Sequence, residues 1–257
     1  MGYRDTLFDL SNRVAVVTGG SRGIGRAIAL GLAEAGADVV ATSRNIESVK
    51  KVTEEIRDRG RRSFAISTDV SRKEDRENLI ARTINELGKI DILVNNAGIS
   101  PFYKKAELTT EEDWDRVISV NLSAPFFCCL EVGKHMIEEK YGKIINVASI
   151  LGQVGFSRQI VYVTTKAGLI AITKTLALEW CQYNINVNAL APGFVETDLT
   201  TDVRGSSYIS ERILRRTAMG RYGKPEEVVG AAIYLASGAS SYVNGAVINV
   251  DGAYLAG

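Results

Sequence analysis

Three side chains in the second half of the sequence have the types and spacing of an acid/base group. Ser149 is followed thirteen residues later by Tyr162, and Lys166 comes four residues after the tyrosine, so the last two share one face of a helix. A tyrosine with its ordinary pKa near 10 is a poor proton carrier at neutral pH, but a neighbouring ammonium lowers that pKa. Tyr162 could then exchange a proton with a substrate oxygen that Ser149 polarises. Because a Tyr-x-x-x-Lys pair alone is usually a surface pair, the prediction needs a second signal.

The second signal is a glycine-rich loop near the start of the chain, Thr18-Gly-Gly-Ser-Arg-Gly-Ile-Gly25. It follows an apolar run over residues 14–18, typical of a strand, and precedes a helix-period segment over residues 24–35. Glycines in this place let the backbone approach a pyrophosphate, and the free N–H groups of the helix start bind it. A plain tight turn is the alternative, and the position between strand and helix argues against it. The loop therefore predicts a dinucleotide site.

Together the two motifs predict an oxidoreductase, because hydride transfer to a carbonyl needs a dinucleotide and a proton carrier in one cleft. A ketone would be reduced to a secondary alcohol, or the alcohol oxidised, with Tyr162 as the acid or base. Lys166 and the positive charge of an oxidised nicotinamide could together lower the Tyr162 pKa by about three units, which corresponds to roughly 4 kcal/mol.

The end of the second expected strand, Thr42-Ser43-Arg44, predicts which dinucleotide binds. An acid there would bind the ribose 2′-hydroxyl of NAD, and the chain has none. Arg44, together with Arg22 in the glycine loop, could instead contact a 2′-phosphate, since guanidinium groups form paired hydrogen bonds to phosphate. The two arginines could also be ordinary surface residues. We expect NADP(H) to be preferred over NAD(H).

Apolar strand-like runs alternate with longer helix-period segments along the chain. The expected strands cover residues 14–18, 39–42, 63–67, 92–94, 143–148, 185–190 and 247–250; the expected helices cover residues 24–35, 46–59, 73–87, 111–139 (one helix or two), 159–182 and a segment from Pro225. Runs that are apolar throughout predict a parallel sheet covered on both faces. The expected fold is α/β: a single doubly wound Rossmann domain over residues 1–257. An irregular stretch over residues 197–220 is a candidate lid, within a substrate loop at about residues 194–220.

Composition excludes several kinds of partner. The 257-residue chain is 46% hydrophobic and has a formal net charge of +1, so no overall field favours nucleic acid or an anionic membrane. No uninterrupted apolar stretch approaches the roughly 18–20 residues of a membrane span, and the amino terminus lacks the pattern of a signal peptide. Three cysteines predict a reducing, cytoplasmic compartment. The single histidine, His135, is expected to be structural, and no metal site is expected.

These motifs make the chain similar to the short-chain dehydrogenase/reductase family over essentially its whole length. The residues that carry the resemblance are residues 18–25, Asp69, residues 95–98, Asn121, Ser149, Tyr162, Lys166, the pair Pro192-Gly193 and Thr197. The resemblance implies a seven-stranded sheet and a homotetramer. It also implies that Asn121 supports a proton-relay water, that Lys166 hydrogen-bonds the nicotinamide ribose and that Thr197 contacts the carboxamide. An apolar stripe on the catalytic helix would then be partly subunit interface, although such a stripe is more often core; it comprises Leu169, Ile172, Leu176 and Trp180.

Two sets of site residues follow. The expected catalytic residues are Asn121, Ser149, Tyr162 and Lys166. The expected cofactor contacts are Gly19, Ser21, Arg22, Gly23, Ile24, Gly25, Ser43, Arg44, Asp69, Val70, Asn96, Ala97, Gly98, Tyr162, Lys166, Pro192, Gly193, Val195 and Thr197. The chain departs from the family pattern at Ala253, where a second glycine is frequent; alanine there would cost about 1 kcal/mol if the position needs positive φ.

The sequence leaves two classes of small-molecule carbonyl or alcohol substrate open. The chain resembles the branch of 3-oxoacyl-acyl-carrier-protein reductases and gluconate 5-dehydrogenases. The first activity is the leading hypothesis, and a sugar or sugar-acid dehydrogenase is the alternative. Docking of a carrier protein uses basic residues beside the cleft; Lys134 is present, but acidic neighbours weaken that surface, namely Glu138, Glu139 and Glu179.

Residues around the cleft bear on the same choice. A sugar acid needs a cation for its carboxylate, and Lys104 and Lys105 could supply it. Three phenylalanines could line the pocket mouth and favour an apolar ketone, or simply anchor loops: Phe102, Phe156 and Phe194. A helix-like segment at residues 210–217 could close over the substrate. Its three arginines could bind an acidic group or form a solvated basic face: Arg212, Arg215 and Arg216. A non-catalytic NADP(H)-binding scaffold is the remaining alternative, and the acid/base set argues against it.

Overall fold

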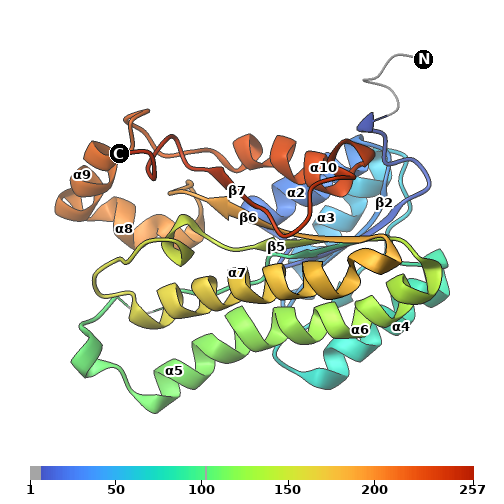
Figure 1. Ribbon diagram of the computed structural model, residues 1–257, viewed down its shortest axis with the longest axis horizontal. Coiled ribbons are helices and arrows are strands. Elements are labelled where there is room, and N and C mark those ends of the chain that lie inside the picture. Colours follow the sequence, from blue (N-terminus) through green and yellow to red (C-terminus); the bar gives the residue numbers. More distant parts are fainter. Residues whose placement is uncertain (1–6, 102) are drawn as a thin grey trace.

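The fold is organised around a sheet of seven parallel strands in the order β3-β2-β1-β4-β5-β6-β7 (Figure 1). The strands are β1 (Val14–Thr18), β2 (Asp38–Ser43), β3 (Ile66–Ser67), β4 (Ile92–Asn95), β5 (Gly142–Val147), β6 (Ile185–Pro192) and β7 (Val247–Val250). The computed structural model describes residues 7–101 and 103–257. Strand order reverses between β1 and β4, and the carboxyl ends of strands at such a point form the dinucleotide crevice of doubly wound folds. The expected fold class and sheet are confirmed.

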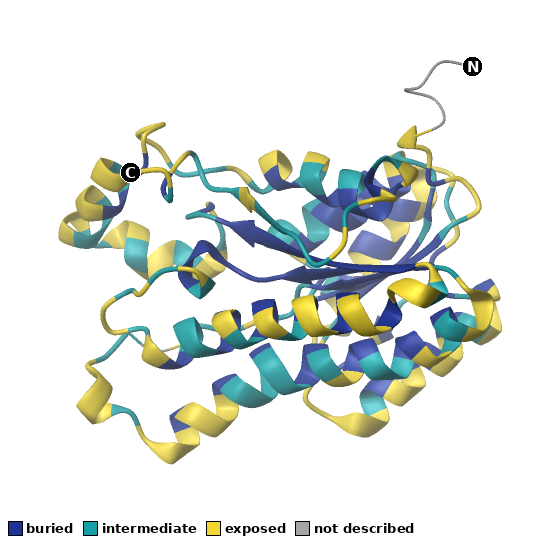
Figure 2. Ribbon diagram, in the orientation of Figure 1, coloured by how far each residue is buried: buried dark blue, intermediate teal, exposed yellow. Residues whose placement is uncertain are grey.

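Helices cover both faces of the sheet. They are α2 (Gly23–Glu34), α3 (Ile46–Asp58), α4 (Lys73–Leu87), α5 (Glu111–Ile118), α6 (Ala124–Glu139), α7 (Ile160–Trp180), α8 (Thr201–Gly205), α9 (Ser207–Arg216) and α10 (Val229–Ala236). One core joins α2, α3 and α10 to the sheet, and a second joins α4, α6 and α7 to its other face (Figure 1). The strands between them are dark with burial in Figure 2, whereas the outer faces of the helices are exposed. Two-sided covering explains why the strands read as continuous apolar runs.

The predicted strands and helices are confirmed with small shifts, except at β3. The expected strand over residues 63–67 pairs with β2 only at Ile66 and Ser67. Phe64 is nevertheless buried, because it packs in the core with α4. Burial of an apolar run was therefore predicted correctly, and its hydrogen bonding was not.

The long helix over residues 111–139 contains a π-helical segment, Ser119–Ser123, between α5 and α6. Insertions of this kind are rare and occur mostly at functional sites. Asn121 lies in the segment and is completely buried. The wider π-helical turn therefore places the polar side chain of Asn121 in the protein interior.

The stretch over residues 197–220 is largely helical: the expected helix-like segment at residues 210–217 overlaps α9, whereas the prediction of an irregular path is wrong for residues 198–209. It contains the short turn Asp198–Thr200, α8 and α9. Only Ile213 of these helices is buried, so polar side chains dominate the segment. α8 and α9 lie at one end of the molecule beside the carboxyl terminus, in the orange part of Figure 1.

Two helical segments, Glu111–Glu139 and Ile160–Tyr183, are long and apolar enough to cross a membrane by length and composition alone. Both segments are interrupted by polar residues, so the statement that no uninterrupted apolar stretch reaches this length stands. The buried side chains of α6 and α7 pack against the sheet in one core. Core packing explains their hydropathy, and this test is weak support for a membrane span.

The apolar stripe on α7 belongs to the interior of the chain. Leu169, Leu176 and Trp180 are buried within the chain, and only Ile172 is partly accessible. Three of its four residues are therefore core, as such stripes usually are, and a part in a subunit interface stays a prediction for Ile172 alone. At the carboxyl end, Ala253 has φ +64°, so the condition for its expected cost of about 1 kcal/mol is met.

Candidate active site

The glycine loop lies at the carboxyl end of β1, where it meets the end of β4. Gly19 has φ +64°, and a Cβ built on it would lie 2.9 Å from Ala97 Cα. A Cβ on Gly25 would lie 2.2 Å from Asn96 Nδ2 and 2.3 Å from Gly19 O. No side chain fits at these distances, so both positions require glycine for close approach of the backbone.

Thr18 and Asn96 fasten the loop to β4. The Thr18 hydroxyl accepts hydrogen bonds from the backbone N–H groups of Asn96 (3.0 Å) and Ala97 (3.1 Å). Asn96 Nδ2 in turn donates to Thr18 O (3.0 Å) and Gly19 O (3.1 Å). The sequence interpretation missed the role of the Thr18 side chain; a hydroxyl ending the first strand is the signal that could have revealed it.

The start of α2 supplies free donors to this loop. Its first flanking residue, Arg22, is extended and makes no side-chain capping bond, and no acid occupies the first turn. The first N–H groups of a helix have no partner within the helix, so they remain available to an anion. This arrangement fits the pyrophosphate of a dinucleotide.

The end of β2 fits the adenosine ribose of that dinucleotide. Ser43 Oγ is buried and has no hydrogen-bond partner among the described residues, although such groups are almost always paired. Arg44 next to it is exposed. Arg22 does not join Arg44: its guanidinium pairs with Asp198 at 2.7 Å, and both side chains are exposed. The predicted pair of arginines is thus not assembled in this structure.

Asp69 and Val70 follow β3. The Asp69 carboxylate accepts bonds from the Ser71 N–H (3.0 Å) and hydroxyl (2.6 Å). Partial burial favours the neutral acid, but the bonds from Ser71 outweigh it and hold the pKa of Asp69 below its ordinary value. The Asp69 carboxylate therefore hydrogen-bonds a residue of its own turn. Its contact with adenine stays a prediction.

The acid/base residues meet at the carboxyl end of β5. Ser149 Oγ accepts from Leu151 N–H (3.1 Å) and hydrogen-bonds the Tyr162 phenol. Lys166 Nζ lies 5.7 Å from the centre of the Tyr162 ring and donates to Val147 O (2.7 Å). All three side chains line one cavity of about 180 Å³. Predicted cofactor contacts line the same cavity: Ile24, Asn96, Gly98, Pro192, Gly193, Val195 and Thr197.

The protein alone does not lower the pKa of Tyr162, and the lowering by Lys166 together with an oxidised nicotinamide stays a prediction. Burial raises the pKa of the phenol, and the hydrogen bond with Ser149 only partly opposes this. Burial also lowers the pKa of Lys166 to about 8. Desolvation disfavours both charged forms, and it outweighs the attraction that the prediction relied on. At neutral pH the pair is therefore a neutral phenol beside a lysine that is still largely protonated.

Asn121 positions the segment after β4. Its Oδ1 accepts from Ile99 N–H and its Nδ2 donates to Ile99 O, both at 2.8 Å. Nδ2 also lies 3.5 Å from Thr165 Oγ1, next to Lys166 in sequence. A Cβ on Gly98 would lie 3.5 Å from Asn121 Oδ1 and 3.7 Å from Lys166 Nζ. Asn121 is thus close to Lys166, as the resemblance implied, and both of its polar atoms bind backbone.

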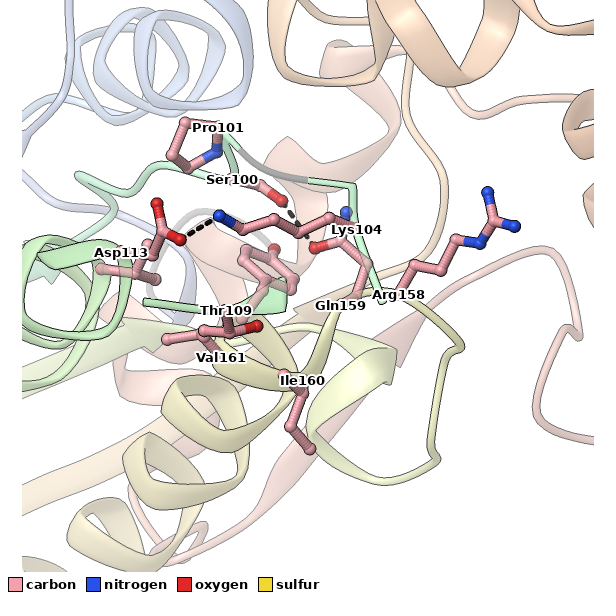
Figure 3. A pocket seen from close by; sticks show the side chains of 11 residues that line it. Ser100, Pro101, Lys104, Thr109, Asp113, Arg158, Gln159, Ile160 and Val161 are labelled. Atoms are coloured by element: carbon pink, nitrogen blue, oxygen red, sulfur yellow. Dashed lines mark hydrogen bonds and ion pairs between the residues drawn. The ribbon is translucent and has the colours of Figure 1, made fainter. Parts of the chain in front are cut away.

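Ser100 and Gln159 form a polar pair at the substrate end of the cavity, and the sequence interpretation missed both. The Ser100 hydroxyl donates to Gln159 Oε1 at 2.9 Å (Figure 3). The pair shares the cavity lining with Tyr162. Gln159 precedes Tyr162 by three residues at the start of α7, and this spacing is the available signal.

An aromatic wall bounds the cleft. Phe156 and Phe194 both line the cavity, and their ring centres are 5.7 Å apart. Tyr254 continues the wall, 5.5 Å from Phe194. The prediction for Phe102 lies outside the described residues.

Cations near the cleft differ in their surroundings. Lys104 pairs with Asp113, and Lys105 lies 3.8 Å from Glu107 (Figure 3 shows the first pair). Arg158 points away from these residues in Figure 3. Three arginines of α9 line a separate cavity of about 490 Å³ that shares Phe156 with the cleft: Arg212, Arg215 and Arg216. Of these arginines, Arg215 pairs with Glu211 at 2.6 Å and Arg216 lies 4.6 Å from the centre of the Tyr254 ring, so this basic face is itself partly engaged.

Within residues 7–101 and 103–257, no group of three or more His, Cys, Asp or Glu side chains could hold a metal ion. Cys128 and Cys129 are buried and unpaired. Burial raises the pKa of the Cys128 thiol to about 12, so it is unreactive at neutral pH.

Comparisons with known proteins agree with this geometry. A family model described as enoyl-(acyl carrier protein) reductase matches residues 19–254. The chain is 42% identical to 2-dehydro-3-deoxy-D-gluconate 5-dehydrogenase of Dickeya dadantii over 250 residues, 97% of this chain and 98% of the relative. It is 40% identical to 3-oxoacyl-acyl-carrier-protein reductase of Aquifex aeolicus over 246 residues, 95% of this chain and 97% of the relative. A crystal structure of a gluconate 5-dehydrogenase from Burkholderia cenocepacia, in complex with NADP and tartrate, superimposes with a TM-score of 0.95 at 36% identity, covering 99% of this chain and 100% of that one.

Proposed function

The chain belongs to the short-chain dehydrogenase/reductase family of oxidoreductases acting on CH–OH and C=O groups, and from this premise we propose that it uses NADP(H) to interconvert a keto-sugar acid and its alcohol. The observation that carries the proposal is one cavity lined both by Tyr162 with its partners and by residues of the glycine-loop end. We take residues 1–257 as one catalytic domain.

Each side chain of the cavity has a separate role in the proposed reaction. NADP(H), when bound, supplies or accepts the hydride at the carbonyl carbon. Tyr162 Oη gives the proton to the carbonyl oxygen during reduction and takes it back during oxidation. Ser149 holds the same oxygen, since its hydroxyl already bonds the phenol. Lys166 lies beside the ring and favours the phenolate when it is protonated.

The end of β2 supports NADP(H) as the preferred dinucleotide. It offers the unpaired Ser43 hydroxyl and the exposed Arg44, and no acid that would bind a 2′-hydroxyl. NADP in the Burkholderia cenocepacia structure supports the same choice. Arg22 would have to leave Asp198 to contribute, which costs little because exposed ion pairs contribute under about 1 kcal/mol.

The Arg44→Asp variant tests this preference. We expect its Kd for NADPH to increase about 10- to 100-fold, because a charge-assisted bond is worth about 1.5–3 kcal/mol. Its Kd for NADH should change less than about threefold. The Lys51→Asp variant makes the same charge change on the exposed side of α3 and serves as control. Fluorescence titration gives both constants, and equal weakening of NADPH and NADH would contradict the assignment.

The polar pair beside Tyr162 favours a hydroxylated substrate over an acyl chain. Because Ser100 donates to Gln159 Oε1, the Gln159 amide Nε2 is directed to donate elsewhere in the cleft. Sites built to hydrogen-bond a hydroxyl group reject analogues that lack it. The name of the Dickeya dadantii relative and the tartrate of the Burkholderia cenocepacia structure support a hydroxy-acid substrate.

A 3-oxoacyl thioester is the second candidate substrate. The Aquifex aeolicus relative acts on this class by name, and the aromatic wall of Phe156 and Phe194 suits an apolar chain. Lys134, which would dock a carrier protein, is followed along α6 by exposed Glu138 and Glu139. We therefore place the sugar acid first, which reverses the order suggested by the sequence.

Initial rates of NADPH and NADH oxidation with 5-ketogluconate and with an acetoacetyl thioester, run side by side, test the function. We expect turnover of the ketogluconate with NADPH. Turnover of the thioester alone would establish the second candidate. Turnover of neither compound with either cofactor would contradict both.

The oligomeric state and compartment are part of the same proposal. Trp114 and Phe127 on the α5–α6 helix and Leu178 on α7 are large apolar side chains that are exposed on the chain. They are candidate contact residues for the homotetramer that the family resemblance implies. The unpaired buried thiols support a reducing, cytoplasmic compartment.

A further inference from the structure

A second polar cavity lies at the amino ends of the strands, opposite the carboxyl ends that form the proposed active site. It has a volume of about 190 Å³ and is lined by the first residues of β5 and β6, including Lys143 and Asn186. The glycine loop and Ser149, in contrast, lie at the carboxyl ends of the strands. The proposed reaction therefore makes no use of this cavity.

Lys143 is buried there without a counterion. Only 3% of the residue is exposed. Its Nζ donates to Asn186 Oδ1 at 2.7 Å and lies 3.4 Å from Ser240 Oγ, and both partners are neutral. No carboxylate among the described residues contacts it. A buried ammonium normally has an opposite charge beside it, because desolvation is costly.

The other charges around the cavity do not neutralise Lys143. Arg13 lies close enough that its charge adds to burial in lowering the pKa of Lys143 to about 8. Asp91 is occupied by Arg13 (2.9 Å) and Lys89 (3.0 Å). Asp9, at the mouth, accepts two bonds from Ser11, its N–H at 2.9 Å and its hydroxyl at 2.6 Å.

The remaining lining is polar, and part of it is engaged with backbone: Asn184 Nδ2 donates to Lys140 O (3.1 Å), Asn186 Nδ2 to Val243 O (3.1 Å) and the Ser237 hydroxyl to Tyr234 O (3.0 Å). The hydroxyl groups of Tyr141 and Ser241 also line the cavity and can donate into it. Arg13 lies flat over the Tyr141 ring at 3.8 Å, which fixes its guanidinium at the wall. The volume far exceeds the roughly 15 Å³ that one water needs. It also has room for a tetrahedral oxyanion.

We propose that this cavity is a binding site for a phosphate-class oxyanion, held by Lys143 and Arg13. The anion supplies the countercharge that the buried ammonium lacks, and the Tyr141 and Ser241 hydroxyls donate to its remaining oxygens. Because β5 begins at the cavity and ends next to Ser149, binding stabilises the strand that carries the catalytic serine. The site does not depend on the proposed substrate or cofactor.

Thermal unfolding of the full chain in phosphate, against sodium chloride of equal ionic strength, is the first test. We expect phosphate to raise Tm by about 2–4 °C. The increment should vanish in Lys143→Met and persist in Lys134→Met, which removes an exposed lysine of α6. Phosphate bound at the glycine loop would stabilise all three proteins equally, and that result would overturn the proposal.

Reductive methylation of the unaltered chain, read by peptide mass spectrometry, is the second test and does not depend on a variant that folds. We expect phosphate to slow labelling of Lys143 at least about threefold, with Lys134 unchanged. Protection by glycerol 3-phosphate as well would assign the site to phosphomonoesters, and protection by inorganic phosphate alone would assign it to free phosphate. Equal labelling of Lys143 with and without either compound would refute the site.

Discussion

Replacing Tyr162 by phenylalanine is expected to reduce kcat by about 10²–10⁴-fold, the usual contribution of a positioned proton carrier, while the Kd for NADPH changes less than about twofold. The substitution removes one hydroxyl, which bonds Ser149, and keeps the ring beside Lys166. It thus leaves the fold and the dinucleotide site in place. Steady-state kinetics with the best substrate and a fluorescence titration of NADPH measure the two quantities.

The matched control is Tyr242→Phe, because the Tyr242 side chain is fully exposed. Its kcat should equal that of the unaltered chain. If Tyr162→Phe also retained full kcat, the proton would come from another group and the acid/base assignment would be lost. Loss of NADPH binding together with kcat would show that the tyrosine supports the cofactor site rather than proton transfer.

The sequence predicted the inner strands of the sheet well because they are buried on both faces. β1 has the predicted bounds, and so does the half-buried edge strand β7. Continuous apolar runs mark such strands wherever they pair. β3 is the exception, since hydrophobic burial of Phe64 extends beyond the two residues that pair with β2.

The lid segment was predicted only in part. The arginine-bearing part of α9 has a helix-like pattern, whereas α8 is too short to show a helical period, and only Ile213 of the two helices is buried. The ion pair between Arg22 and Asp198 joins residues 176 positions apart. No local pattern indicates such a contact, and the interpretation of Arg22 as a free phosphate ligand could not anticipate it.

Residue types and spacing were sufficient to predict which side chains form the acid/base group. Ser149, Tyr162 and Lys166 meet because a strand end and one helix face bring them together. The direction of the Tyr162 pKa shift was not predictable, because it depends on how completely the phenol is desolvated. Likewise the polar pair Ser100 and Gln159 depends on the path of the loop after β4.

A Gly25→Ala substitution is expected to weaken NADPH binding at least about 100-fold and to lower Tm. The added Cβ would lie 2.3 Å from Gly19 O and 2.2 Å from Asn96 Nδ2, so the loop must move away from β4. That movement breaks the 3.1 Å bond between Asn96 and Gly19 and displaces the N–H groups at the start of α2. Overpacking of this kind typically costs about 1–3 kcal/mol in stability. Titration with NADPH and thermal unfolding measure both effects.

The Gly230→Ala variant is the control for the added methyl group. Gly230 lies inside α10, and no atom lies within 4 Å of a Cβ built on it. Alanine there should stabilise the helix by up to about 1 kcal/mol and leave NADPH binding unchanged. Should Gly25→Ala bind NADPH as tightly as the unaltered chain, the glycine loop would not be the pyrophosphate site. A lower Tm with normal affinity would point to the same conclusion, because the loop would then matter for packing alone.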